Sequence, residues 1–418
     1  MQLYEFKETQ ERVILIGVQT GVGDDVEASL DELDELAQTA GAETVAKVIQ
    51  NREAVHPGTY IGKGKIEEVA SLLRALDANG VICDDELSPS QLNNLERELD
   101  CKVMDRTLLI LDIFARRAVS SEGKIQVELA QLRYRAARLV GLRESLSRLG
   151  GGIGTRGPGE KKLETDRRII RDRISRLSKD LEEIKNHREV ARQNRSRTAV
   201  PVAAIVGYTN AGKSTLLNYM TDAGILSEDK LFATLDPTTR AMNLPNGEKI
   251  LLTDTVGFIR KLPHNLIEAF KSTLEEAKYA DIIVHVVDAS SPDRDIQMDV
   301  VYKTLKELEV GDKPVVTLFN KCDKFENGDT EAPVLRDFKA DETAYISART
   351  GRGIADFEAI LEKIIRESRV HLVQTFAYAD AGKIQQIRAQ GQLIKEEYTE
   401  NGIEVEAYVP KALYQKLQ

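Results

Sequence analysis

Short apolar runs alternate with amphipathic stretches over residues 1–114. The runs have the length of buried strands and lie at 13–18, 81–84 and 103–105. The amphipathic stretches have the three- and four-residue spacing of helices and lie at 30–37, 64–77 and 88–99. This alternation predicts a small α/β domain over residues 1–114.

Over residues 115–198 the apolar positions narrow to one seam in each of two long stretches. Such seams predict two helices that pack together as an antiparallel coiled hairpin. The glycine-rich segment 150–159 separates them and is predicted to be the exposed tip. The predicted seam residues are Ile125, Leu129, Leu132, Ala136, Leu139, Leu146, Leu163, Ile170, Ile174, Leu177, Leu181 and Ile184.

Residues 199–368 contain nearly continuous apolar runs at 199–206, 282–288 and 315–319. Parallel strands buried on both faces have this pattern. Because helical stretches lie between the runs, we predict a doubly wound α/β sheet that binds its ligand at the carboxyl ends of its strands. His285 lies inside one run and is interpreted as a structural residue.

Residues 369–418 are too few for a large core of their own. Their pattern predicts a strand, a helix and a strand at 372–377, 381–398 and 403–409. We therefore expect a small α+β C-terminal domain that docks on its neighbour.

The charge is unevenly distributed along the 418 residues, whose formal net charge is −10. Residues 116–176 contain sixteen basic and only seven acidic side chains. The charges of a plain surface hairpin would be mixed and solvated, whereas these are mostly of one sign, with Arg156 in the predicted tip. The pattern favours a hairpin that binds RNA.

The sequence also limits the location of the protein. No apolar run approaches the roughly 20 residues that a membrane helix needs, and residues 1–8 lack the basic and apolar regions of a secretory signal. Cys83, Cys101 and Cys322 have no metal-like or paired spacing. We expect a reduced, cytoplasmic protein, and nothing in the sequence indicates more than a monomer.

A phosphate loop and a guanine motif indicate the ligand. Residues 207–214 match G-x-x-x-x-G-K-[ST], the loop that surrounds nucleotide phosphates. Residues 320–323 read Asn-Lys-Cys-Asp, and the carboxylate of Asp323 can accept hydrogen bonds from guanine N1–H and the exocyclic amine. Adenine has no N1–H, so this site would reject it. The pair of motifs predicts a GTP-binding domain.

The position of each residue in these motifs predicts its role in nucleotide binding. Lys213 should contact the β- and γ-phosphates, and Ser214 and Asp254 should hold Mg²⁺. Thr238, which we prefer to Thr239, should sense the γ-phosphate and reach the ion. The candidate catalytic residues are Lys213, Thr238 and Gly257. The candidate nucleotide-binding residues are Gly207, Tyr208, Thr209, Asn210, Ala211, Gly212, Lys213, Ser214, Thr215, Asp254, Gly257, Asn320, Lys321, Asp323, Ser347, Ala348 and Arg349.

Phe258 occupies the position after Asp-x-x-Gly where many GTPases have a glutamine that orients the attacking water. An aromatic ring cannot do this, so we expect slow hydrolysis until a partner or an ion completes the site. Asn210 lies beside the phosphates, and its amide oxygen is a candidate ligand for K⁺.

Five segments resemble the HflX family of ribosome-associated GTPases, and the likeness covers nearly the whole chain. An apolar residue at position 258 fits that family's pattern. The segments are 84–91, 150–160, 207–215, 232–238 and 254–258.

The resemblance implies a protein that binds the 50S ribosomal subunit, with the hairpin tip reaching toward the peptidyl transferase centre in 23S rRNA. It implies that the GTP state splits stalled or idle 70S ribosomes and that the ribosome stimulates hydrolysis. Two alternatives stay open. One is a 50S assembly or storage factor, and the other is ATP-dependent RNA remodelling by residues 1–115. Residues 60–65, with Gly62 and Gly64, open a predicted helix and could hold an anion or form a plain turn and cap.

Overall fold

The computed structural model forms two compact units. Unit 1 comprises residues 1–184, 229–236 and 259–271, and unit 2 comprises residues 185–228, 237–258 and 272–418. The structure describes residues 11–21, 25–149, 158–196, 200–221, 231–232, 235–261, 276–325 and 335–417.

Unit 1 contains a four-stranded parallel sheet in the order β2-β1-β3-β4. The three predicted strands are confirmed, and β2 is an additional strand that the apolar pattern did not predict. Its burial pattern shows one fully buried position, since it lies at the sheet edge. The strands are β1 Arg12–Gln19, β2 Glu43–Asn51, β3 Gly80–Cys83 and β4 Lys102–Asp105.

The three helices predicted for this domain are present, and α4 is an additional helix that the sequence analysis did not predict. In α1, the apolar residues Leu30, Leu33, Leu36 and Ala37 are all fully buried. A capping box between Ser88 and Gln91 starts α3, because each side chain bonds the other residue's amide. The helices are α1 Val26–Thr39, α2 Lys63–Ala75, α3 Pro89–Leu99 and α4 Arg106–Arg117.

The segment 60–65 forms a turn that leads into α2. A bridge joins His56 to Tyr60, and the amide of Gly62, the N-cap of α2, donates to Gln50 Oε1 at 2.9 Å. These contacts are those of a turn that leads into a helix, and anion binding at this segment stays a prediction.

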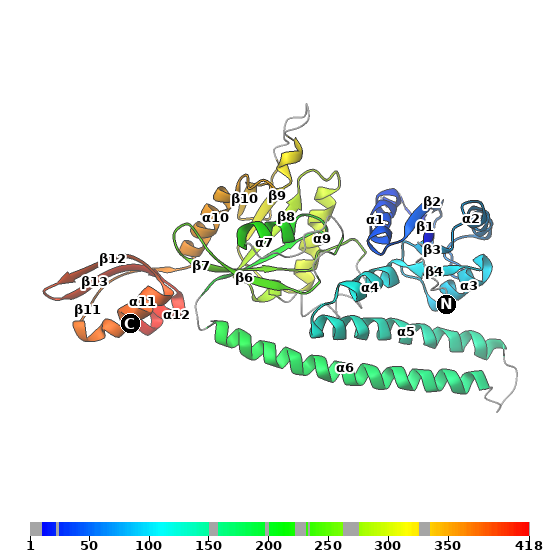
Figure 1. Cartoon of the computed structure of the whole chain (residues 1–418), viewed down its shortest axis with the longest axis horizontal. Helices are drawn as coiled ribbons and strands as arrows, with labels where there is room; N and C mark the ends of the chain where they lie inside the picture. The colour runs from blue at the N-terminus through cyan, green and yellow to red at the C-terminus, as the bar shows by residue number, and fades with distance from the viewer. Residues whose placement is uncertain are drawn as a thin grey trace, which may run out of the picture. The chain divides into compact units, whose positions relative to one another are not determined.

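The two long helices of the predicted hairpin are present as α5 Ser121–Leu149 and α6 Pro158–Ser196, and they lie side by side (Figure 1). Leu129 packs with Leu177 and Leu181 in their seam, and Glu128 pairs with Arg173 at 2.8 Å. Residues 150–157 of the predicted tip lie outside the described residues.

A buried carboxylate fixes α5 to the sheet of unit 1. Asp105, at the end of β4, is fully buried. Its Oδ1 accepts hydrogen bonds from Leu108 N and Tyr134 Oη, at 2.9 and 2.7 Å. Its Oδ2 accepts from Leu87 N and Arg138 Nη2, at 3.0 and 2.5 Å. One side chain therefore joins β4, α4 and the middle of α5.

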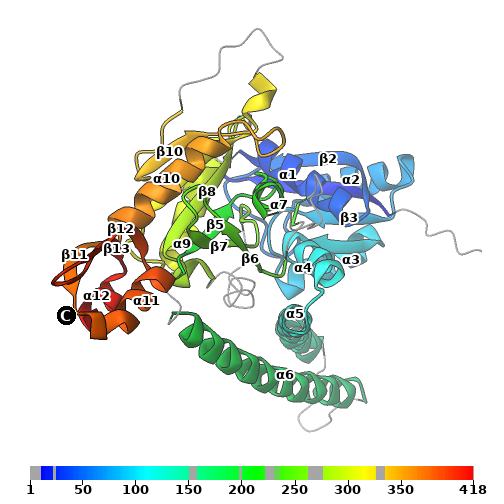
Figure 2. The ribbon, with the colours of Figure 1, turned by 60° about the vertical axis from the view of Figure 1, so that its left-hand side comes forward.

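Unit 2 contains a six-stranded sheet in the order β10-β9-β8-β5-β7-β6, with β8, β5 and β7 side by side (Figure 2). It is parallel except for β6, which pairs antiparallel with β7 and was not predicted. The strands are β5 Val202–Gly207, β6 Thr238–Asn243, β7 Lys249–Asp254, β8 Ile282–Asp288, β9 Val315–Asn320 and β10 Glu342–Tyr345. The helices are α7 Lys213–Thr221, α9 Arg294–Glu307, the 3₁₀ helix η1 Cys322–Phe325 and α10 Ile354–Glu367.

The C-terminal segment forms a three-stranded antiparallel sheet in the order β11-β13-β12, with α11 and α12 packed on one face. The prediction of one helix over 381–398 was wrong. The helix ends before Gly391, and the following residues pair with β13 as a strand. The elements are β11 Val370–Phe376, η2 Tyr378–Asp380, α11 Ala381–Gln390, β12 Gln392–Thr399, β13 Gly402–Val409 and α12 Lys411–Leu417.

A guanine-nucleotide site in unit 2

The phosphate loop joins β5 to α7 and requires glycine at both ends. A Cβ at Gly207 would lie 2.2 Å from the backbone oxygen of Val286. Gly212 has φ +97°, and a Cβ there would lie 2.2 Å from Asn320 Nδ2. Loop residue Thr209 is buried, and its hydroxyl has no hydrogen-bond partner among the described residues. A buried hydroxyl of this kind is suited to bind a phosphate oxygen.

Asn320 holds two parts of the predicted site together. Its side-chain amide donates to Ala211 O at 2.8 Å, and its carbonyl oxygen accepts from Ala348 N at 2.9 Å. The first residue of the guanine motif therefore bonds both the phosphate loop and the segment 347–349, although the three lie far apart in sequence.

Lys213 is the first residue of α7 and is buried. Its ammonium donates to Tyr208 O at 2.7 Å. Its pKa is lowered to about 8, mainly by burial, with nearby Asp254 opposing the shift and Lys321 adding to it. A buried cation at the start of a helix is a strong site for an anion.

The predicted magnesium ligands lie together. Ser214 Oγ donates to Asp254 Oδ2 at 2.7 Å. Thr238 is directly opposite Asp254 in the β6–β7 register, whereas the hydroxyl of Thr239 pairs with Thr253 at 2.9 Å. Successive strand residues point to opposite faces, so Thr238 shares a face with Asp254. This arrangement fits Mg²⁺ better at Thr238 than at Thr239.

The segment after β7 lies against the phosphate loop. Phe258 N donates to Gly207 O at 3.1 Å, and Thr209 N donates to Phe258 O at 2.8 Å. A Cβ on Gly257 would lie 2.9 Å from Lys213 Nζ, so only glycine allows this approach. Phe258 is buried, and both of its backbone polar groups bond the loop.

The loops predicted to bind guanine also converge. Asp323 Oδ1 accepts from Ser347 Oγ at 2.7 Å, and Ser347 is fully buried. Lys321 pairs with Asp288, at the end of β8, at 2.8 Å. Arg349 is exposed in the turn that follows. Asp288 was not among the predicted residues, although a carboxylate at the end of a buried strand was a usable signal.

Among the described residues, no three His, Cys, Asp or Glu side chains gather as a metal site. A magnesium ion at Ser214, Asp254 and Thr238 would therefore take its remaining ligands from phosphate and water, as is usual for this ion. No helix in the described part of the chain is long and apolar enough to cross a membrane.

A mixed sheet with a phosphate loop after its central strand and a guanine-selective motif after β9 defines a GTPase of the P-loop class. Three family models match successive parts of the chain: "GTP-binding GTPase N-terminal" over 27–115, "GTP-binding GTPase Middle Region" over 117–195 and "50S ribosome-binding GTPase" over 202–321. Together they cover most of the chain, including the hairpin.

Curated relatives match over nearly full length. A protein of Lacrimispora saccharolytica named GTPase HflX is 66% identical over 100% of this chain and 97% of its own. The Escherichia coli GTPase HflX is 42% identical over 89% and 87%. The chain belongs to the HflX family of GTPases, as its motifs indicated, and it binds guanine nucleotides and hydrolyses GTP.

Among solved structures, a GDP complex named SsGBP is 26% identical and covers 86% of this chain and 99% of that one, with a TM-score of 0.48.

Proposed function

We propose that this GTPase binds the 50S ribosomal subunit and, in its GTP state, splits stalled or idle 70S ribosomes. The basic hairpin would contact 23S rRNA near the peptidyl transferase centre. The observation that carries the proposal is a guanine-nucleotide site in the same chain as the basic segment 116–176, which contains sixteen basic side chains, most of them on α5 and α6. The description of the matching model as a 50S ribosome-binding GTPase supports the choice of partner.

In this proposal, the phosphate loop and Lys213 bind the β- and γ-phosphates, and Thr238 and Gly257 contact the γ-phosphate. Magnesium, held by Ser214 and Asp254, would neutralise charge on the phosphates during hydrolysis. Since the side chain of Phe258 is an apolar ring, it cannot orient water. Hydrolysis by the isolated chain should be slow, and the ribosome should accelerate it.

A potassium ion could supply additional positive charge beside the phosphates. Asn210 has φ +61° and lies in the phosphate loop, where its amide oxygen could hold the ion. Turnover measured in matched K⁺ and Na⁺ buffers tests this. We expect faster hydrolysis in K⁺ and a loss of the difference in Asn210→Ala, whereas equal rates in the two buffers would remove the ion from the proposal.

Sedimentation of 70S ribosomes with the full chain tests the function. With GTP or a non-hydrolysable analogue, we expect conversion to 30S and 50S subunits, and with GDP we expect intact 70S. If 70S particles stay intact in every case while the chain migrates with isolated 50S, the protein is an assembly or storage factor instead.

A further inference from the structure

Unit 1 includes two short segments that lie next to the γ-phosphate contacts in sequence. The first ends at Asp236, two residues before Thr238, and the second begins at Ile259, two residues after Gly257. The described parts of these segments are 231–232, 235–236 and 259–261. Each makes specific polar contacts inside unit 1.

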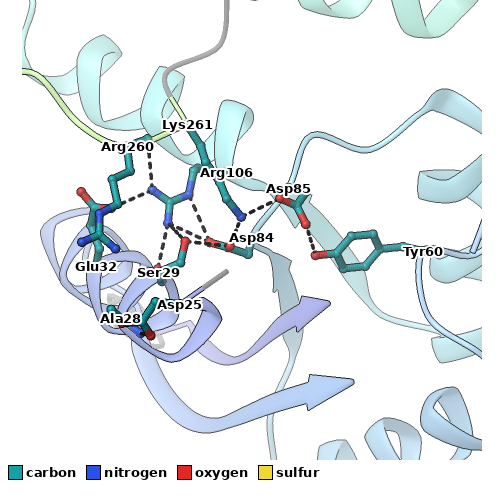
Figure 3. A network of polar contacts seen from close by, with 10 residues as sticks. All are labelled: Asp25, Ala28, Ser29, Glu32, Tyr60, Asp84, Asp85, Arg106, Arg260 and Lys261. Carbon is teal, nitrogen blue, oxygen red and sulfur yellow. Dashed lines mark hydrogen bonds and ion pairs between the residues drawn. The ribbon is translucent and has the colours of Figure 1, made fainter. Parts of the chain in front are cut away.

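The second segment is held by two aspartates. Lys261 Nζ lies 2.5 Å from Asp84 Oδ2 and 2.7 Å from Asp85 Oδ1 (Figure 3). Asp84 is fully buried just after β3, and Asp85 accepts a hydrogen bond from Tyr60 Oη at 2.6 Å. Lys261 itself has φ +51°. A lysine in the left-handed region is uncommon and needs contacts that hold it there.

The side chain of Arg106 contacts the backbone of the same segment. Its buried guanidinium donates to Arg260 O at 3.3 Å and to Asp84 Oδ1 at 2.7 Å (Figure 3). It also donates to Ser29 O at 2.8 Å and pairs with Glu32 at 3.2 Å. Arg106 is thus fixed by α1 and β3 while it contacts the backbone of residue 260.

Of the two cations that contact Asp84, Lys261 is the one whose ion pair can break without leaving this buried carboxylate unpaired. Burial acts to raise the pKa of Asp84, but the charges of Arg106 and Lys261 outweigh it and hold that pKa below its usual value. Arg106 is almost entirely buried, whereas the side chain of Lys261 is 41% exposed. If Lys261 withdrew to water, Asp84 would keep the guanidinium as its partner. The cluster can therefore exist with and without Lys261.

The first segment is held by the start of the hairpin. Asp236 Oδ2 accepts from the amides of Val119 and Ser120 at 3.0 and 2.7 Å, and its Oδ1 accepts from Ser120 Oγ at 2.5 Å. These residues immediately precede α5, so Asp236 supplies a carboxylate to a helix N-terminus. Phe232 packs edge-on against Phe114, with ring centroids 4.6 Å apart.

A γ-phosphate bound by Lys213 needs the space beside its ammonium, where Gly257 packs so closely that a Cβ would lie 2.9 Å from Nζ. Entry of that phosphate should displace Gly257 outward, and only residues 258–260 separate it from Lys261. GDP has no γ-phosphate and should leave this backbone in place.

We propose that Asp236 and Lys261 are positioning residues that oppose GTP, but not GDP, and that release of their contacts transmits the nucleotide state to the hairpin and the N-terminal sheet. The described contacts restrain the segments on either side of Thr238 and Gly257. Binding of GTP must weaken them, so by linkage their removal strengthens GTP binding. This rests on the GTP site and does not depend on a ribosomal partner.

Two variants release one contact each. Lys261→Met keeps the aliphatic stem and removes the ion pairs. Gly123→Ala places a Cβ 2.4 Å from Asp236 Oδ1 within α5, where alanine favours the helix. The matched controls are Lys102→Met, which removes an exposed pair with Glu11, and Gly64→Ala, where the Cβ meets nothing within 4 Å.

The measurement is the affinity of the full chain for a non-hydrolysable GTP analogue and for GDP, by competition with a fluorescent nucleotide. Each contact variant should bind the analogue about fivefold tighter, at the lower end of allosteric coupling, with GDP affinity within about twofold of the parent. The controls should change neither. A plain structural defect would weaken both ligands, and an unchanged or reduced analogue preference in both variants would overturn the proposal.

A second readout follows the hairpin directly. The chain contains no tryptophan, so Val119→Trp, at a side chain that is 80% exposed beside the Asp236 contact, gives a single reporter. Its emission should change with the GTP analogue and not with GDP, and Gly123→Ala should abolish the difference. Identical emission with both nucleotides would contradict the proposed transmission, whatever the result with ribosomes.

Discussion

A histidine lies in the middle of the unit 2 sheet. His285 in β8 is 1% exposed, and its Nδ1 has no hydrogen-bond partner among the described residues, with Asp337 3.9 Å away and Tyr302 packed edge-on. Burial lowers its pKa to about 4, helped by Lys213 and Lys339 and opposed by Asp337. The prediction from sequence that it is a core residue is confirmed by its burial.

This histidine should make unit 2 sensitive to acid. Its folded pKa lies below the unfolded value of 6.5, so the unfolded chain binds the extra proton between these values. Stability is therefore complete above about pH 6.5 and falls as the pH approaches 4, by about 2 kcal/mol at pH 5. Urea unfolding of the parent and His285→Gln at pH 5 and 7.5 measures the effect. A loss that is equally large in His285→Gln would assign it to other groups.

Asn320 should be needed for either nucleotide. Asn320→Ala removes the contacts to both Ala211 and Ala348, so the phosphate loop and the segment 347–349 lose their common support. We expect the affinity for GTP and GDP to fall alike by at least about tenfold, since two hydrogen bonds of about 1 kcal/mol each are lost. Equilibrium titration checks this. Cys322→Ala, in the variable position of the same motif, should leave the affinity unchanged.

At the scale of elements, the sequence predicts best what is local. The strands 13–18, 282–288 and 315–319 are buried on both faces, so their apolar runs suffice. β2 and β6 lie at sheet edges and carry few buried positions, so only their pairing with β1 and β7 reveals them. The strand β12 has the charged residues of a helix surface, and its conformation follows from Gly391 and from β13.

The attachment of α5 is an element-scale feature that can be tested at Asp105. Tyr134→Phe removes one of its bonds and should cost about 1–3 kcal/mol. Arg138→Met removes its cation from a fully buried carboxylate and should cost about 3 kcal/mol. Urea unfolding measures both. Arg173→Met, which breaks the exposed pair with Glu128, should change little. Equal effects in all three would show that burial of the carboxylate is unimportant.

At the scale of the whole molecule, motifs predict the site residues but not the contacts that support them. The phosphate loop, Asp254 and residues 320–323 are recognisable because the nucleotide dictates them. The contacts of Asp84 with Lys261 and of Asp236 with Ser120 join residues 177 and 116 positions apart. No local pattern encodes such pairs, so the membership of residues 229–236 and 259–271 in unit 1 could be found only from the structure.

If the hairpin binds rRNA, its exposed arginines should determine the salt dependence of binding to 50S subunits. Arg168, Arg171 and Arg176 are exposed on α6. Their replacement by glutamine should reduce the slope of log affinity against log salt by about 0.7 for each lost phosphate contact. Binding at several salt concentrations measures it. Glutamine at the exposed Lys303, Lys306 and Lys411 removes the same charge and should leave the slope unchanged.

Unit 1 is built from segments that are far apart in sequence, and this has a consequence during synthesis of the chain. Arg106 leaves the synthesising ribosome about 155 residues before Lys261, which at typical elongation rates is roughly 10 to 30 s. During that interval the N-terminal sheet and the hairpin can form. Asp85 does not yet have its partner Lys261, and the amides before α5 do not yet have their partner Asp236. Unit 1 therefore reaches its final form only after the phosphate loop has been made, and before the guanine motif at 320–323 has been added.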